Sequence, residues 1–242
     1  MPNHALLALA AVGGALITLL AGCTLVQINQ AHRLASESAP FSISPPNTNA
    51  RLLIAGDSTA VGTGASSPQT SLAGLVSTTM PRLAITNAGV NGARFADVVI
   101  QLKAHSERFD AVLIQAGGND VIRLTAAAAL RRDIQAALAN ATKIAPIVML
   151  MPAGNVGNAP FFFAPWSWWM TARARTLHKI IREEAARTGA IYINLFKSRA
   201  LDPFAQHPER FHAADGLHPS DAGYRLWLDE LLAQSPALRN FE

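Results

Sequence analysis

The chain has 242 residues, of which 50% are hydrophobic and only 15% are charged, and its formal net charge is +4. This composition excludes a mainly disordered chain and fits a single globular domain with an N-terminal extension. The positive charges are dispersed and form no basic block, so a nucleic-acid partner is not expected.

An uncharged apolar run extends from Ala5 to Val26 and is typical of a signal-peptide core or a short membrane anchor. Its end, Leu20-Ala21-Gly22-Cys23, resembles a bacterial lipobox, in which the cysteine becomes the lipidated first residue of the mature protein. No lysine or arginine precedes this motif, which leaves an uncleaved anchor helix as the alternative. In both cases residues 1–26 tether the protein to a membrane, and we expect it in the bacterial cell envelope.

Residues 27–50 are polar, contain prolines and are expected to form a linker, which leaves residues 51–242 as the folded domain. In this domain, short apolar runs rich in β-branched residues alternate with segments of helical periodicity. Runs of this kind are typical of buried parallel strands. The five predicted strands are RLLIA (51–55), LAITNA (83–88), AVLIQA (111–116), PIVMLM (146–151) and AIYINL (190–195).

Helical spacing of apolar residues is found over 95–102, over 177–184 and over 224–232. Ser220 is expected to cap the last of these helices, because it follows Pro219 and precedes the periodic segment. Strands that alternate with helices predict a parallel sheet with right-handed crossovers.

Polar and glycine-rich segments follow the first three strands and precede the last helix. In a parallel α/β sheet, such segments meet at the carboxyl edge, where ligands bind. The four segments are Gly56-Asp57-Ser58-Thr59, Asn87-Ala88-Gly89-Val90-Asn91-Gly92, Gly117-Gly118-Asn119-Asp120 and Asp215-Gly216-Leu217-His218-Pro219.

Several familiar sites do not fit these segments. The stretch LLIAGDSTAVGTG (52–64) lacks the Gly-Lys-Ser/Thr of a phosphate loop, and Ala60 stands where a Gly-x-Ser-x-Gly nucleophile elbow needs glycine. The spacing of His207, His212, Asp215 and His218 matches no zinc signature. We therefore expect neither a metal nor another cofactor.

A serine nucleophile with a separate base does fit. A serine hydroxyl attacks poorly unless a base removes its proton, and that base works best when an acceptor fixes its orientation. Asp215 and His218 lie on one short turn and can reach Ser58 together. A glycine N–H and the Asn119 amide are suitable donors for a developing oxyanion.

These segments resemble the motif blocks of the SGNH hydrolases, also called the GDSL lipase/esterase family. The blocks occur in the family's order over residues 51 to about 233, as Gly56-Asp57-Ser58, Gly89, Gly117-x-Asn119-Asp120 and Asp215-x-x-His218. The resemblance implies a three-layer α/β/α sandwich around a flavodoxin-like, five-stranded parallel sheet. It also implies an esterase-type activity that needs no metal.

Carried over to this chain, the resemblance makes Ser58 the nucleophile, His218 the general base and Asp215 the residue that orients His218. It assigns the oxyanion hole to the backbone N–H groups of Ser58 and Gly89 and to the Asn119 side chain. The fourth letter of the first block is Thr59 rather than leucine, which puts the subfamily and the substrate in doubt.

An aromatic segment over 161–170 follows the fourth predicted strand and should lie near the same edge. It could be an acyl-binding wall or a lid at a lipid interface, where tryptophan is favoured. Equally, part of it could open the next helix and pack on the sheet. Its candidate residues are Phe161, Phe162, Phe163, Trp166, Trp168 and Trp169.

The expected activity is hydrolysis of carboxylic esters, with lysophospholipids or other acyl esters as substrates. Deacetylation of sugars and thioester hydrolysis are alternatives within the same family. An alternative of another class is a non-catalytic envelope lipoprotein that binds a lipid or a glycan in the same crevice. The expected partners are an ester substrate and a membrane, without an obligate protein partner.

Overall fold

The computed structural model describes residues 22 and 25–241, so Cys23, which we expect to be lipidated, and most of the apolar N-terminal run lie outside the described residues. In the part of the chain that is described, no helix is both long enough and apolar enough to cross a membrane. The signal or anchor helix expected over 1–26 therefore stays a prediction.

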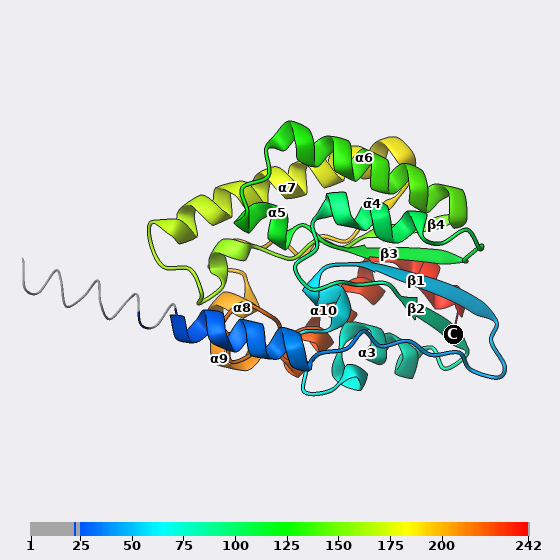
Figure 1. Cartoon of the computed structure of the whole chain (residues 1–242), viewed down its shortest axis with the longest axis horizontal. Helices are drawn as coiled ribbons and strands as arrows, with labels where there is room; N and C mark the ends of the chain where they lie inside the picture. Colours follow the sequence, from blue (N-terminus) through cyan, green and yellow to red (C-terminus); the bar gives the residue numbers. More distant parts are fainter. Residues whose placement is uncertain (1–21, 23–24, 242) are drawn as a thin grey trace, which may run out of the picture.

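All five predicted strands form, and they pair in one parallel sheet of order β2-β1-β3-β4-β5 (Figure 1). This order confirms the flavodoxin-like topology, which has its switch point between β1 and β3. The strands are β1 (Ala50–Gly56), β2 (Leu83–Asn87), β3 (Ala111–Gln115), β4 (Ile147–Leu150) and β5 (Ile191–Tyr192).

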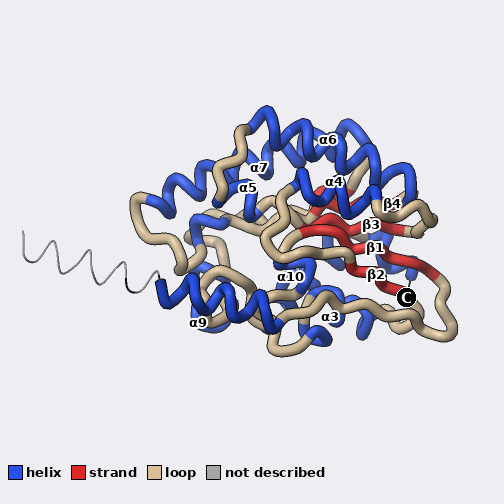
Figure 2. Tube along the Cα trace, in the orientation of Figure 1, coloured by secondary structure: helices blue, strands red, loops and turns tan. Residues whose placement is uncertain are grey.

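Helices cover both faces of the sheet and complete three layers (Figure 2). The longer helices are α3 (Leu72–Thr79), α4 (Phe95–Lys103), α6 (Ala127–Ile144), α7 (Trp166–Thr188) and α10 (Asp221–Gln234). The short helices are α2 (Ser58–Val61), η1 (Pro68–Thr70), α5 (Gly118–Ile122), η2 (Val156–Asn158), α8 (Pro203–Gln206), α9 (Pro208–Phe211) and η3 (Pro236–Phe241).

Strand residues alternate between two apolar cores because successive side chains point to opposite faces of the sheet. Leu53 and Ala55 of β1 pack in the core beneath α4, α6 and α7. Leu52 and Ile54 pack in the other core, beneath α3 and α10. As expected, Ser220 caps α10, where its side chain accepts a hydrogen bond from the Gly223 N–H.

Part of the segment that we expected to be a linker is helical, over residues 25–37 (Figure 1). After this helix the chain runs back along the sheet, where Ile43 forms an antiparallel bridge with Ile85 of β2. The helix is partly covered along one side, at positions with helical spacing. These half-buried residues are Gln27, Gln30, Ala31, Leu34, Ala35 and Ser38.

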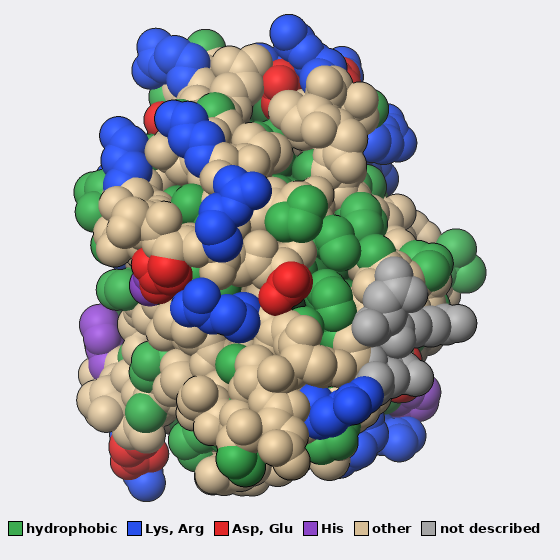
Figure 3. Space-filling view, turned by 90° about the vertical axis from the view of Figure 1, so that its right-hand side faces the viewer, with side chains coloured by type: hydrophobic (Ala, Val, Ile, Leu, Met, Phe, Trp, Pro, Cys, Tyr) green, Lys and Arg blue, Asp and Glu red, His purple; other side chains and the backbone are tan. Residues whose placement is uncertain are grey.

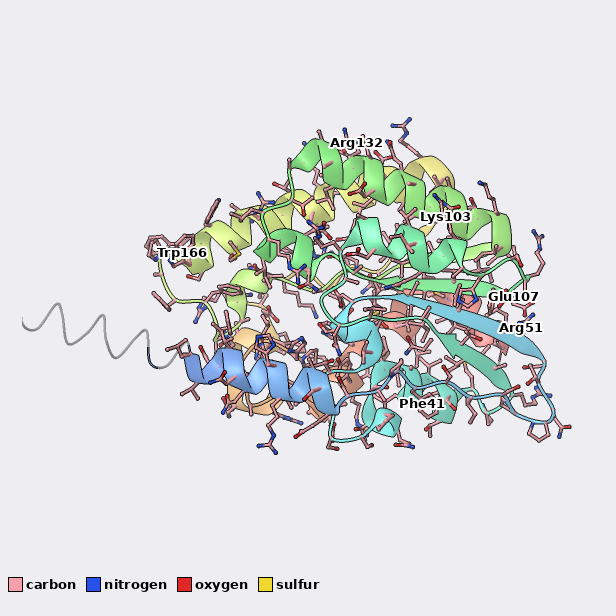
Figure 4. All side chains as sticks on the ribbon, viewed as in Figure 1. Phe41, Arg51, Lys103, Glu107, Arg132 and Trp166 are labelled. Carbon is pink, nitrogen blue, oxygen red and sulfur yellow. The ribbon has the colours of Figure 1, made fainter. Side chains whose placement is uncertain are left out.

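The two ends of the molecule along its longest axis differ in character. Arg51, Lys103 and Glu107 lie at the end where the strands begin, and lysine and arginine side chains are spread over that face (Figures 3 and 4). Trp166 and the start of helix 25–37 lie at the opposite end (Figures 1 and 4). The carboxyl edge of the sheet faces this second end.

Candidate active site

Ser58 lies where β1 ends and α2 begins. Gly56 allows the chain to turn there, because a Cβ at this position would lie 1.9 Å from the carbonyl oxygen of Gln115 on β3. Asp57 caps α2, and its Oδ1 accepts hydrogen bonds from the N–H of Thr59 at 2.9 Å and the hydroxyl of Thr59 at 2.8 Å. These contacts fix the backbone at Ser58, directly after a buried strand.

The carboxyl group of Asp57 is almost fully buried, with 2% exposure. Burial raises the pKa of Asp57 to about 6, although the hydrogen bonds from Thr59 oppose this effect. Asp57 therefore acts as a structural hydrogen-bond acceptor at the start of α2. The threonine at the fourth position of the first block supplies both donors, one from its backbone and one from its side chain.

Ser58, His218 and Asp215 are brought together in a chain of hydrogen bonds. His218 Nε2 lies 2.8 Å from Ser58 Oγ, and His218 Nδ1 lies 2.5 Å from Asp215 Oδ2. An ionised carboxylate can only accept, so Nδ1 carries the proton and Nε2 accepts from the Ser58 hydroxyl. This arrangement lets the imidazole take the hydroxyl proton while the carboxylate stabilises the resulting positive charge.

Asp215 is completely buried, and its Oδ1 accepts from the N–H groups of Leu217 at 2.9 Å and of His218 at 3.0 Å. Burial raises the pKa of Asp215, but the hydrogen bonds and charge of His218 and the backbone donors outweigh it and hold the pKa below its usual value. Asp215 is therefore ionised in the neutral pH range, as an orienting carboxylate must be.

The loop that follows α2 packs directly against the histidine turn. Gly64 has φ of 95°, and a Cβ at this position would lie 2.4 Å from the carbonyl oxygen of Pro219 and 2.9 Å from the Cβ of His218. The hydroxyl of Tyr224, in α10, donates to the carbonyl oxygen of Thr63 at 2.8 Å. These contacts hold the Ser58 and His218 loops in register.

The predicted oxyanion donors differ in their placement. Asn119 lines the same pocket as Ser58, and its Nδ2 donates to the carbonyl oxygen of Ala93 at 3.1 Å, which leaves its second amide hydrogen available. Gly89 does not line this pocket. It is buried against α2, and its N–H donates to Asn87 Oδ1 at 3.0 Å.

Gly92 occupies the position at the pocket that we had expected for Gly89. It lines the pocket with φ of 78°, a conformation that favours glycine. Within the described residues, the N–H groups of Gly92 and Ser58 donate to no protein acceptor. The loop contains two glycines, and their spacing alone does not tell which N–H faces the substrate.

The pocket around Ser58 has a volume of about 390 Å³. One wall comes from helix 25–37, which the sequence did not indicate as part of the site. Deeper walls combine side-chain amides with apolar groups. The lining residues include Ala31, His32, Ala35, Asn155, Asn158, Leu195, Phe204, His212, Leu217 and Trp227.

His207 and His212 lie in the same part of the chain as His218 and Asp215. In the residues that the structure describes, no three His, Cys, Asp or Glu side chains are grouped as metal ligands. His212 lines the pocket, and burial lowers its pKa to about 4, so its ring is neutral there.

Part of the aromatic segment opens helix α7, and several of its rings are exposed. Met170 and Ser167 are buried, so the segment opens α7 and packs on the core. All of the candidate aromatic rings except Trp168 line a neighbouring hollow of about 260 Å³ with Ile122, Leu124 and Met170. None of the six rings lines the Ser58 pocket. Four of the rings are exposed: Phe163 by 44%, Trp166 by 50%, Trp168 by 71% and Trp169 by 43%.

Solved structures with the same fold include LAE5, an α/β hydrolase enzyme from the metagenome of Lake Arreo. It is 20% identical over 79% of this chain and 97% of its own, with a TM-score of 0.62. TesA is 20% identical over 78% of this chain and 99% of its own, with a TM-score of 0.61. Axe2, an acetylxylan esterase from Geobacillus stearothermophilus, is 18% identical over 78% of this chain and 94% of its own, with a TM-score of 0.56.

A search of curated proteins gave no match. The model of the GDSL-like lipase/acylhydrolase family, however, matches residues 54–226, a range that includes Ser58, Asn119, Asp215 and His218. The chain therefore belongs to the GDSL-like lipase/acylhydrolase family.

Proposed function

We propose that this protein hydrolyses carboxylic esters through an acyl-enzyme on Ser58. The observation that carries the proposal is the unbroken hydrogen-bond chain from Ser58 Oγ through His218 to Asp215. Membership of the GDSL-like lipase/acylhydrolase family supports it. A binding protein would have no need of a base within 2.8 Å of a serine hydroxyl in its pocket.

In the first step, Ser58 Oγ attacks the ester carbonyl carbon while its proton passes to His218 Nε2. The tetrahedral intermediate then collapses, and the alcohol leaves with that proton. In the second step, His218 takes a proton from water, the hydroxide attacks the acyl-enzyme, and the acid is released as Ser58 regains its proton. Asp215 holds the imidazole in the required tautomer throughout.

We assign the oxyanion hole to the N–H groups of Ser58 and Gly92 and to the side-chain amide of Asn119. This assignment replaces Gly89 with Gly92, because the N–H of Gly89 is used by Asn87 Oδ1. A preorganised donor of this kind contributes about 10²–10³-fold to kcat.

We propose that the substrates are esters whose acyl group is apolar. The support is the size of the pocket, about 390 Å³, and the apolar side chains that line it beside Ser58. Deacetylation of a sugar remains the second candidate, because Axe2, which shares the fold, is described as an acetylxylan esterase.

We also propose that the N-terminus tethers the protein to a membrane in the bacterial envelope. Support comes from the apolar run of residues 5–26 and from the exposed aromatic rings of the 161–170 segment, which share one end of the molecule with the start of helix 25–37. Labelling with a palmitate analogue that is lost in Cys23→Ser would establish lipidation. Membrane association without label would indicate an uncleaved anchor.

The test of the activity is hydrolysis of p-nitrophenyl esters, from acetate to palmitate, by the full-length protein. We expect turnover of medium or long chains, with a loss of several orders of magnitude in both Ser58→Ala and His218→Ala. Turnover of acetate alone would favour the deacetylase. An inactive, folded parent would favour the non-catalytic lipid- or glycan-binding alternative.

A further inference from the structure

Helix 25–37 lies across the loops that carry the candidate catalytic residues, although it precedes the region that matches the family model. Figure 1 shows it as a separate helix beside the carboxyl edge of the sheet, outside the helical layers that cover the two faces. It therefore packs on the site rather than on the core.

The C-terminal end of this helix is fixed to two of the loops by hydrogen bonds. Asn91 Nδ2 donates to the carbonyl oxygen of Ala35 at 2.9 Å, and the hydroxyls of Ser38 and Thr63 lie 2.9 Å apart. Thr63 in turn donates to Asn91 Oδ1 at 2.7 Å. Thr63 belongs to the Ser58 loop and Asn91 to the loop of Gly92, so one polar cluster joins the helix to both.

The N-terminal half of the helix reaches the histidine turn. The side-chain amide nitrogen of Gln27 would lie 3.3 Å from a Cβ placed at Gly216, the residue between Asp215 and Leu217. The helix thus contacts the site at both of its ends. Between these contacts, residues of the helix line the same pocket as Ser58 and His218.

Ala31, His32 and Ala35 are the residues of this helix that line the pocket of Ser58 and His218. Ala31 and Ala35 are four residues apart and therefore share one helix face. Both side chains are a single methyl group, and larger side chains at these positions would occupy the pocket.

We infer that helix 25–37 is a wall of the substrate pocket and that the methyl groups of Ala31 and Ala35 set the size of the ester that can reach Ser58. The inference rests on the proposed esterase function, whose substrate selectivity it assigns to residues outside the family-matched region. A bulkier residue at either position should exclude long acyl chains and still admit acetate.

The experiment compares Ala31→Trp, Ala35→Trp and the milder Ala35→Leu in the full-length protein. The matched control is Ser36→Trp, because Ser36 is exposed and does not line the pocket. For each variant, kcat/KM is measured with p-nitrophenyl acetate and p-nitrophenyl decanoate. Acetate turnover serves as the internal standard for correct folding.

The expected result is a fall of about tenfold or more in the decanoate-to-acetate ratio of kcat/KM in the alanine variants, with Ser36→Trp unchanged. Ratios in all three alanine variants that equal the ratio of Ser36→Trp would overturn the inference while leaving the esterase function intact. A parent protein that hydrolyses neither ester would overturn the proposed function, and the inference with it.

Discussion

Thr59 donates two hydrogen bonds to one oxygen of Asp57, from its backbone N–H and from its hydroxyl. These bonds hold a carboxyl group that is buried directly before Ser58, with 2% exposure. They compensate only part of the cost of burial, because the pKa of Asp57 is still raised to about 6.

The raised pKa predicts that ionised Asp57 destabilises the fold. The pKa of Asp57 in the folded protein lies above its usual value of 3.8. Protonated Asp57 therefore contributes its full stability below pH 3.8, and this contribution is lost as the pH rises through about 6. Asp57→Asn should therefore raise the free energy of unfolding by about 2 kcal/mol at pH 8 and change it little at pH 4. Denaturant melts at the two pH values measure this, and an equal loss of stability at both would contradict it.

His178 predicts the opposite dependence on pH. It is buried between the Tyr192 hydroxyl and the carbonyl oxygen of Ala153, and burial lowers its pKa to about 4. Neutral His178 contributes its full stability to the folded protein above pH 6.5, its usual pKa, and this contribution is lost as the pH falls towards 4. The loss of unfolding free energy between pH 7 and pH 4 should be about 2–3 kcal/mol smaller in His178→Gln than in the parent. Parallel pH profiles for the two proteins would refute this role.

Gly64 lies where the Ser58 loop packs against the His218 turn, and Gly189 serves as a control for substitutions there. Both have positive φ, of 95° and 76°, but a Cβ at Gly189 meets nothing within 4 Å, whereas one at Gly64 meets Pro219 and His218. Gly189→Ala should cost about 1–2 kcal/mol from backbone strain alone. Gly64→Ala should cost about 1–3 kcal/mol more and lower kcat about 10²-fold, because His218 must shift. Equal effects of the two substitutions on stability and on kcat would show that the loop contact is unimportant.

The exposed tryptophans allow a test of the proposed membrane contact. Trp166, Trp168 and Trp169 are between 43% and 71% exposed, whereas Trp227 is 7% exposed. When the full-length protein is bound to vesicles that contain brominated phospholipid, the bromine should quench the tryptophan fluorescence. The quenched emission should come from the three exposed tryptophans. Replacement of all three by phenylalanine should abolish most of the quenching, since Trp227 is buried. Unquenched emission from the membrane-bound parent would place this surface away from the lipid.

The strands and the residues of the candidate site could be predicted because their signals are local. Buried parallel strands are continuous apolar runs, and Ser58 and Asn119 follow two of them directly. Asp215 and His218 stand three residues apart on one short turn before the last helix. The fifth strand is shorter than predicted, because Asn194 ends it: its N–H donates to Gln234 Oε1 at 2.7 Å and its side chain accepts from Tyr192 and Phe196.

Other features depend on long-range contacts that no local pattern reveals. Glu184 is a charged residue of α7, yet it is 2% exposed and pairs with Arg131 of α6 at 2.5 Å. Apart from Leu34, the covered side of helix 25–37 consists of alanine, glutamine and serine, so it does not resemble a core-facing stripe. The choice of Gly92 over Gly89 depends on which N–H remains free after the loop has folded.

The central claim is that His218 activates Ser58 as a nucleophile, and covalent labelling with a fluorophosphonate tests it most directly. Intact mass measurement should show one adduct on the parent, none on Ser58→Ala, and labelling slowed by several orders of magnitude in His218→Ala. A folded parent that forms no adduct, or a Ser58→Ala variant labelled at the parent's rate, would contradict the claim.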